Sequence, residues 1–133
     1  MAARTPVDLL DTHTLVWALN APERLSPAAR RIVEDGDIVV SAASLWEMLL
    51  KKGRRAEIVP DPAAWWRRYV RQAGVRVLAI QDNHIGHLDA LPPHHADPFD
   101  RILICQCMDE GLRLVTRDAE IRDHYQGLVS VVW

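Results

Sequence analysis

The chain has 133 residues, 49% hydrophobic and 26% charged, which is the size and composition of a folded domain and excludes a disordered or fibrous segment. The formal net charge of −2 argues against a protein held to nucleic acid by overall positive charge, so any such contact must be local. Neither a signal peptide nor an apolar run approaching the roughly 18 residues of a membrane span is found, so we expect one cytoplasmic domain, residues 1–133, with no membrane contact.

Short β-branched segments alternate with longer helical patterns along the whole chain, which is typical of a parallel sheet connected by helices. Each helix returns the chain to the edge where the previous strand began, so we expect an α/β fold with a mostly parallel five-stranded sheet. The expected strands are Val7–Asp11, Asp37–Val40, Val75–Ile80, Leu112–Thr116 and Val129–Val132. The expected helices span about residues 12–19, 27–35, 42–52, 62–73, 83–90, 98–110 and 119–124.

Residues typical of helix ends support these boundaries. Ser26-Pro27 has the pattern of an N-cap followed by proline in the first turn. Glycines stand where four of the helices are expected to end, at Gly36, Gly53, Gly74 and Gly111. Cys105 and Cys107 lie two apart on one expected helix and point in different directions, so we predict buried thiols and neither a disulfide nor a zinc knuckle.

Acidic residues follow the expected strands. Asp11 ends the first strand, and Asp118 follows the fourth. An aspartate at such a place is also a good helix N-cap, worth about 1 kcal/mol, and for either residue alone the cap is the more ordinary explanation. Asp82, which also precedes an expected helix, is interpreted as a cap and nothing more.

Glu47 lies on the helix after the second strand and is the only charged residue between Ala42 and Leu50. The helix is apolar nearly all round, so we expect it to be buried. A buried carboxylate needs a cation, a metal or a hydrogen-bond partner. Ser44-x-x-Glu47 also matches a capping box, but if Ser41 is the N-cap then Glu47 lies too far inside the helix for that role.

The segment "DPFD", residues 97–100, places two acids at the start of the next expected helix. Asp97 before Pro98 has the pattern of an N-cap, which leaves Asp100 in the first turn with its side chain directed inward. We therefore expect Asp97 to start the helix and support a site, and Asp100 to reach a metal.

In an open parallel sheet these acids meet at one edge, where ligands bind. Carboxylates crowded together repel one another unless a cation lies between them. An oxygen-only set of ligands is the kind that Mg²⁺ or Mn²⁺ prefers. The pattern therefore indicates a site for a hard divalent cation.

Four segments, "LLDTHTLVWAL", "VSAASLWEMLLKKG", "LPPHHADPFDRILICQ" and "EGLRLVTRD", together resemble the PIN domain family, and within it the VapC-type toxins of bacterial toxin–antitoxin pairs. The resemblance covers nearly the whole chain, in the family's order. It implies a three-layer α/β/α sandwich and a ribonuclease dependent on Mg²⁺ or Mn²⁺. The site residues that it implies are the catalytic, metal-binding acids Asp11, Glu47, Asp100 and Asp118, with Asp97 as an auxiliary acid and Thr12, Ser44 and Thr116 as supporting hydroxyl residues.

The chemistry expected of such a site is hydrolysis of an RNA phosphodiester by a water that the metal activates. The resemblance further implies a homodimer and a small VapB-type antitoxin whose C-terminal segment lies across the active-site groove, with the Trp-rich helices supplying apolar contacts. The basic residues are by default solvated, but some are possible RNA contacts: Lys51, Lys52, Arg54, Arg55 and Arg117.

Other functions remain open from the residues alone. One is a non-catalytic phosphoacceptor or nucleotide-binding module, which Asp8 beside Asp11 favours and the lack of a Gly-rich phosphate loop opposes. Another is a nuclease of the same fold that cuts DNA. The histidines, His84-x-x-His87 among them, match no familiar zinc spacing and are expected to be solvated or hydrogen-bonded. Tryptophans on expected helices (Trp17, Trp46, Trp65, Trp66) favour core or interface positions over base stacking.

Overall fold

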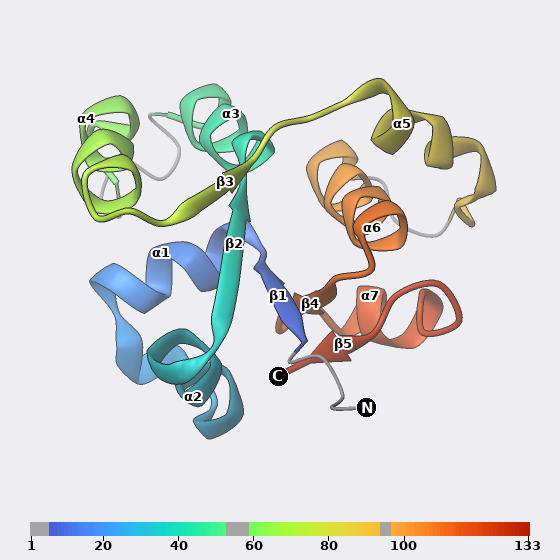
Figure 1. Cartoon of the computed structure of the whole chain (residues 1–133), viewed down its shortest axis with the longest axis horizontal. Coiled ribbons are helices and arrows are strands. Elements are labelled where there is room, and N and C mark those ends of the chain that lie inside the picture. The colour runs from blue at the N-terminus through green and yellow to red at the C-terminus, as the bar shows by residue number, and fades with distance from the viewer. Residues whose placement is uncertain (1–5, 53–58, 94–96) are drawn as a thin grey trace, which may run out of the picture.

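The computed structural model describes residues 6–52, 59–93 and 97–133. Its sheet has five strands in the order β3-β2-β1-β4-β5, and each of the four pairings is parallel (Figure 1). The strands are β1 Val7–Leu10, β2 Asp37–Ser41, β3 Arg76–Leu78, β4 Arg113–Val115 and β5 Val131–Val132. The predicted parallel α/β fold is confirmed.

Helices connect successive strands. The α-helices are α1 Thr12–Asn20, α2 Pro27–Asp35, α3 Ala42–Leu50, α4 Pro62–Trp66, α5 Asp82–Ile85, α6 Pro98–Glu110 and α7 Ala119–His124. Shorter or differently wound turns are η1 Pro22–Arg24, η2 Arg67–Arg71 and η3 Gly86–Ala90. Across the described ranges, none of these helices combines the length and apolar character needed to cross a membrane.

The sheet separates two apolar cores, because neighbouring side chains of a strand point to opposite faces. Leu9 of β1 packs with α6 and α7, whereas Leu10 packs with α1, α2 and α4. Val39 and Val40 of β2 divide in the same way. Helices therefore cover both faces (Figure 1), which confirms the expected three layers.

The predicted helix boundaries agree best with the structure where a capping residue determines the end of the helix. Ser26 accepts a hydrogen bond from the Ala29 amide and caps α2, and Gly111 ends α6 with a positive φ of 67°, which favours glycine. Gly53 lies outside the described residues. The expected cap Asp82 is wrong: Gln81 caps α5 in a reciprocal box with His84, and Asp82 is the first helical residue.

Two expected helices are interrupted. The one over 62–73 is α4 followed by the wider turns of η2, and the one over 83–90 narrows from α5 into the 3₁₀ turns of η3. The strands β3, β4 and β5 are shorter than expected, and β3 and β5 lie at the two sheet edges. An edge strand has one neighbour to pair with, so its ends lack the hydrogen bonds that would extend it.

The expectation that α3 is buried all round is also wrong. Glu47 is only 4% exposed, but Trp46, Leu49 and Leu50 are 57%, 44% and 64% exposed. Residues 46, 49 and 50 are spaced three and four apart and therefore share one outward helix face. An apolar face of this kind indicates an interaction surface.

Candidate functional site

Four of the predicted acids, Asp11, Asp97, Asp100 and Asp118, line one open hollow of about 470 Å³. Asp11 directly follows β1, and Asp118 follows β4, the strand beside it. The chain runs from β1 to β2 and β3 on one side and then crosses to β4 and β5 on the other. The hollow therefore lies where the strand order reverses, which is the usual ligand position in an open α/β sheet.

Asp11 is held by both of its carboxylate oxygens. Oδ1 accepts a hydrogen bond of 2.8 Å from the Thr14 amide, which caps α1, and Oδ2 accepts one of 2.6 Å from the Thr116 hydroxyl. The side chain is buried, with 6% of the residue exposed, and burial raises the pKa of this carboxyl, although the hydrogen bonds from Thr116 and Thr14 act in the opposite direction. A nearby cation would favour its charged form.

Thr116 also orders the second acid. Its hydroxyl oxygen accepts a hydrogen bond of 3.1 Å from the Asp118 amide, while the same hydroxyl donates to Asp11. The Asp118 carboxylate caps α7 through Oδ1, at 2.8 Å from the Glu120 amide. Thr116, predicted as a supporting residue, thus connects the acids that follow β1 and β4.

The two acids of "DPFD" occupy the positions expected of them. Asp97 Oδ1 accepts a hydrogen bond of 2.9 Å from the Phe99 amide and caps α6. Asp100 lies in the first turn of α6, half-buried, and lines the hollow. Asp97 lines the hollow too, and its second carboxylate oxygen, Oδ2, lies 3.5 Å from Lys51 Nζ.

Glu47 does not line this hollow. Its Oε2 lies 2.5 Å from Lys51 Nζ, and its buried Oε1 has no hydrogen-bond partner. Ser41 is the N-cap of α3, so the capping-box explanation for Glu47 is wrong. Lys51 Nζ is also 3.5 Å from Asp97 Oδ2, so the lysine links Glu47 to the acids of the hollow.

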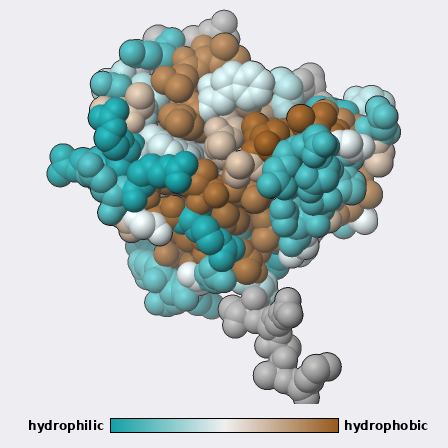
Figure 2. Space-filling view, turned by 45° about the horizontal axis from the view of Figure 1, so that its top comes forward, coloured by the Kyte–Doolittle hydropathy of each residue, from teal (hydrophilic) through white to brown (hydrophobic). Residues whose placement is uncertain are grey.

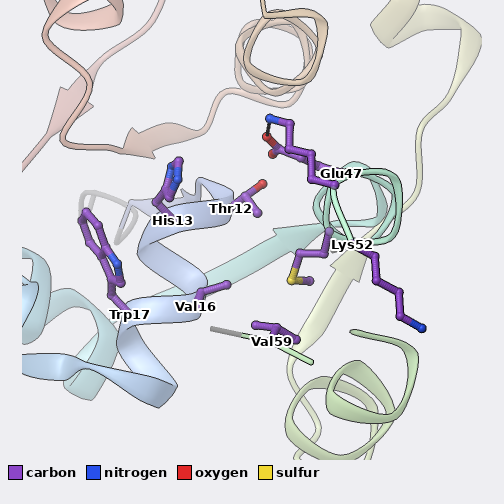
Figure 3. Close-up of a pocket in the computed structure, with 9 residues that line it drawn as sticks. Thr12, His13, Val16, Trp17, Glu47, Lys52 and Val59 are labelled. Carbon is purple, nitrogen blue, oxygen red and sulfur yellow. Dashed lines mark hydrogen bonds and ion pairs between the residues drawn. The ribbon is translucent and has the colours of Figure 1, made fainter. Parts of the chain in front are cut away.

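A second, more apolar pocket adjoins the hollow between α1 and α3. Thr12, Val16 and Glu47 line it, and His13 and Trp17 line both cavities. Figure 3 shows the Thr12 and Val16 side chains of α1 directed toward α3 and Val59, with the Glu47 carboxylate at one end. Thr12 and Ser44, the two other predicted supporting residues, join α1 to α3 through a 2.9 Å hydroxyl–hydroxyl bond.

The donor set fits a hard divalent cation by its chemistry: all the predicted ligands are carboxylate oxygens, Asp11 is buried, and Glu47 Oε1 is buried without a partner. The acids of the hollow are nevertheless not drawn tightly together. In the part of the chain that the structure describes, one group of three or more potential ligands has its atoms within 4.8 Å of one another, and it is His84, Asp109 and Glu110.

The group at His84 is explained by hydrogen bonds. His84 Nδ1 accepts from the Gln81 amide at 3.0 Å, and Nε2 lies 3.0 Å from Glu110 Oε1, so both ring nitrogens have partners. His87 Nε2 is 3.0 Å from Asp109 Oδ1. These contacts tie α5 and η3 to the C-terminal end of α6, and the expected hydrogen-bonded histidines are confirmed.

The basic residues predicted as RNA contacts lie in different surroundings. Arg117 is exposed, lines the hollow, and has its guanidinium carbon 5.5 Å from the centre of the Trp17 ring. Lys52 is exposed, whereas Lys51 is paired with acids. Arg54 and Arg55 lie outside the described residues.

Two features of the site were missed from sequence. The i,i+4 spacing of Glu47 and Lys51 signals an ion pair, whereas the sequence analysis predicts a solvated residue or an RNA contact for Lys51. Asp8 was counted in favour of a phosphoacceptor, yet it is buried and paired with Arg113 through contacts of 2.7 and 3.0 Å. Asp8 therefore links β1 to β4 through this ion pair. Its position beside Asp11 no longer supports a phosphoacceptor module.

The tryptophans divide between core and surface. Trp65 and Trp66, the last two residues of α4, are buried, as expected for core residues. Trp17 is half-buried beside Trp133, with ring centres 6.1 Å apart. Trp46 is exposed and meets the Phe99 ring edge-on at 5.0 Å, which fits the interface alternative.

Comparison with known proteins identifies relatives that match nearly the whole chain. The PIN domain family model matches residues 9–126. Ribonuclease VapC22 of Mycobacterium tuberculosis is 31% identical over 128 residues, which cover 94% of this chain and 97% of that protein. Among solved structures, DNA-bound VapBC from Salmonella typhimurium has a TM-score of 0.68 at 18% identity, covering 96% of this chain and 97% of that one. VapBC2 from Rickettsia felis, bound to a promoter DNA fragment, has a TM-score of 0.63 at 12% identity, covering 95% and 97%.

Proposed function

The chain belongs to the PIN domain family, and we propose that it is a metal-dependent endoribonuclease that acts in the cytoplasm as the toxin of a toxin–antitoxin pair. The observation that carries the proposal is the meeting of Asp11, Asp97, Asp100 and Asp118 in one hollow at the switch point of the sheet. The proposal treats residues 1–133 as one domain, which the family match over most of the chain supports.

Asp11, Asp100, Asp118 and Glu47 would hold the divalent cation, Mg²⁺ or Mn²⁺, with Asp97 as the auxiliary acid. Such an ion supplies activation of a water molecule and neutralises charge on the phosphate. Thr116 orients Asp11 and Asp118, and the Thr12–Ser44 bond fixes the start of α1 against α3. These side chains thereby hold the site in shape before an RNA binds.

RNA would approach across the exposed rim of the hollow. Arg117 stands at this rim and offers a guanidinium to a backbone phosphate. Trp17, which lines the hollow beneath it, offers an aromatic face. Lys52 is a further phosphate contact in this proposal, and Arg54 and Arg55, which lie outside the described residues, keep the role predicted from sequence.

The apolar pocket between α1 and α3 is the proposed binding site of the antitoxin. Its lining combines Val16, Trp17, Met48 and Val59 with the charged groups of Glu47, Lys51 and Lys52. An amphipathic or extended segment of a VapB-type antitoxin would bury apolar side chains there and cover the adjoining acidic hollow. Occupation of both cavities at once explains how such a partner would block cleavage.

The outward face of α3 is the proposed homodimer surface. Trp46, Leu49 and Leu50 expose apolar area there, and Ile85 of α5 is a further exposed apolar residue. Figure 2 shows hydrophobic residues gathered in a brown area bordered by teal side chains on one face of the molecule. A second copy of the chain would remove such a surface from water.

RNA cleavage by the partner-free protein tests the proposal. Purified protein should cut RNA in Mg²⁺ or Mn²⁺ and stop when EDTA is added, and Asp100→Asn should be inactive while it keeps the wild-type circular dichroism spectrum. A panel of RNAs and single-stranded DNA of matched sequence separates the ribonuclease from a DNA-directed enzyme. Cleavage that persists in EDTA, or equal cleavage by Asp100→Asn, would reject the metal mechanism.

A further inference from the structure

Two arginines from distant segments of the chain contact the ring of Trp17. The guanidinium carbon of Arg24, on η1, lies 5.8 Å from the centre of the ring, and that of Arg117, between β4 and α7, lies 5.5 Å from it. Both arginines are exposed, and Trp17 is half-buried. One indole therefore brings together two positive charges at the surface, and we term these three residues the Trp17 cluster.

The Trp17 cluster begins at the acidic hollow and extends beyond it. Trp17 and Arg117 line the hollow, whereas Arg24 is not among the described residues that do. Figure 3 shows the Trp17 ring beside His13 and turned away from Glu47. The cluster thus carries positive charge from the rim of the hollow onto η1, along the α1 side of the molecule.

The backbone that holds Arg24 is anchored on both sides. The next residue, Leu25, is buried in the core between the sheet and the helices α1, α2 and α4. The guanidinium of Arg30, on α2, donates a hydrogen bond of 2.8 Å to the carbonyl oxygen of Pro22, the first residue of η1. An exposed side chain on a fixed backbone loses less conformational freedom on binding than one on a mobile loop.

The chemistry of the Trp17 cluster suits a nucleic acid strand. A planar guanidinium can stack on an aromatic ring and still donate N–H groups in its own plane. Neither Arg24 nor Arg117 forms an ion pair with another residue of the described ranges, so neither charge is compensated there. Phosphate oxygens match the fork of a guanidinium, and most contacts to a nucleic acid are of this kind.

We propose that the Trp17 cluster is a phosphate-binding site for single-stranded RNA outside the catalytic hollow, in which Arg24 binds a backbone phosphate of the strand where it leaves the hollow over α1. The inference rests on the proposed function and deepens it, because it gives the RNA a path and gives Arg24 a binding role. Arg117 binds a phosphate nearer the hollow, and Trp17 keeps both guanidiniums in place. The acids act on one phosphodiester, and the cluster binds its neighbours.

RNA binding in EDTA, where no metal-dependent cleavage occurs, tests this inference. The probe is a fluorescent single-stranded RNA of about twelve nucleotides, followed by anisotropy over a range of salt concentrations. Arg24→Gln should weaken binding about five-fold or more at low salt and should reduce the slope of log affinity against log salt by about 0.7, the value for one phosphate of a single strand. Arg24→Lys keeps the charge and should keep the slope.

Arg68→Gln is the matched control. Arg68 is exposed and its guanidinium carbon lies 5.3 Å from the centre of the Tyr69 ring, so it too is a surface arginine on an aromatic ring. It belongs to η2, and its ring partner packs against Trp65. Arg68→Gln should bind RNA with the affinity and salt slope of the wild type. Equal weakening by both glutamine variants would show that general surface charge binds the RNA, and the inference would be wrong.

Cleavage kinetics separate this inference from the proposed function. Arg24→Gln should raise the KM for RNA more than it lowers kcat, and its melting temperature should match that of the wild type because the side chain is exposed. Unchanged affinity and salt slope in Arg24→Gln, or no RNA binding by the wild type in EDTA, would overturn the inference and leave a metal-dependent ribonuclease standing. RNA binding that depends on Arg24, without any metal-dependent cleavage, would overturn the proposed enzyme and keep the RNA-binding site.

Discussion

The Thr116 hydroxyl donates a 2.6 Å hydrogen bond to Asp11 and accepts a 3.1 Å bond from the Asp118 amide, so one side chain aligns the acids that follow β1 and β4. Thr116→Val keeps the shape and removes both bonds. We expect it to destabilise the protein by roughly 1–2 kcal/mol and to weaken Mn²⁺ binding by about ten-fold or more. Thr116→Ser keeps the hydroxyl and should bind Mn²⁺ nearly as the wild type does. Urea titration and isothermal calorimetry measure the two effects, and equal metal affinity in both variants would show that the hydroxyl does not serve the site.

The two acids of "DPFD" should respond differently to substitution. Asp100→Asn removes a negative charge from a crowded acidic hollow, so the metal-free protein should be as stable as the wild type or more so. Its Mg²⁺-dependent rise in melting temperature should vanish. Expression of Asp100→Asn, or of Asp11→Asn, should no longer arrest bacterial growth. Full toxicity of both variants would show that these acids are not the site.

Asp97 is a helix cap and a partner of Lys51. Asp97→Ser keeps a cap acceptor, whereas Asp97→Ala removes it and should cost about 1 kcal/mol more in unfolding free energy. The Mg²⁺ shift in melting temperature should survive in Asp97→Ser. Loss of that shift to the same extent as in Asp100→Asn would make Asp97 a metal ligand and not an auxiliary acid.

The Asp8–Arg113 pair should contribute to stability and not to catalysis. Asp8 is buried and makes a two-pronged contact with Arg113, and removal of one partner from such a pair costs up to several kcal/mol. Arg113 is 35% exposed at its side chain, which moderates the expected cost of Asp8→Asn to about 2 kcal/mol. Metal affinity at a temperature where the variant is folded should be unchanged, and a changed affinity would implicate Asp8 in the site.

The two cysteines should resist thiol reagents in the folded protein. Burial raises the pKa of Cys105 to about 11, and it also raises the pKa of Cys107. A thiol with a raised pKa stays protonated as the pH rises through the usual thiol range, so the reactive thiolate remains scarce at pH 8 to about 9. Labelling with iodoacetamide should be slow in buffer and fast in urea. Rapid modification of the native protein would mean that the helix around these residues opens.

Local patterns in the sequence determined much of this protein. Alternation of β-branched and helical segments is enough for a parallel α/β fold, because each crossover helix returns the chain to the same sheet edge. The caps Asp11, Ser26, Asp97 and Asp118 were also predictable, since a cap bond joins residues two or three positions apart. The spacing of Cys105 and Cys107 on one helix was enough to predict that they form no disulfide with each other.

Contacts between distant segments were decided by the tertiary structure alone. Asp11 meets Thr116, and Asp8 meets Arg113, across 105 positions because the strand order places β1 beside β4. Lys51 reaches Asp97 only because α3 and α6 pack together. Burial of Glu47 beside an exposed Trp46 likewise depends on which face of an almost wholly apolar α3 turns toward the core. A sequence pattern predicts the structure of a residue from its near neighbours in the chain. These pairings depend instead on the order of the strands and on how the helices pack, and both are determined by the packing of the whole chain.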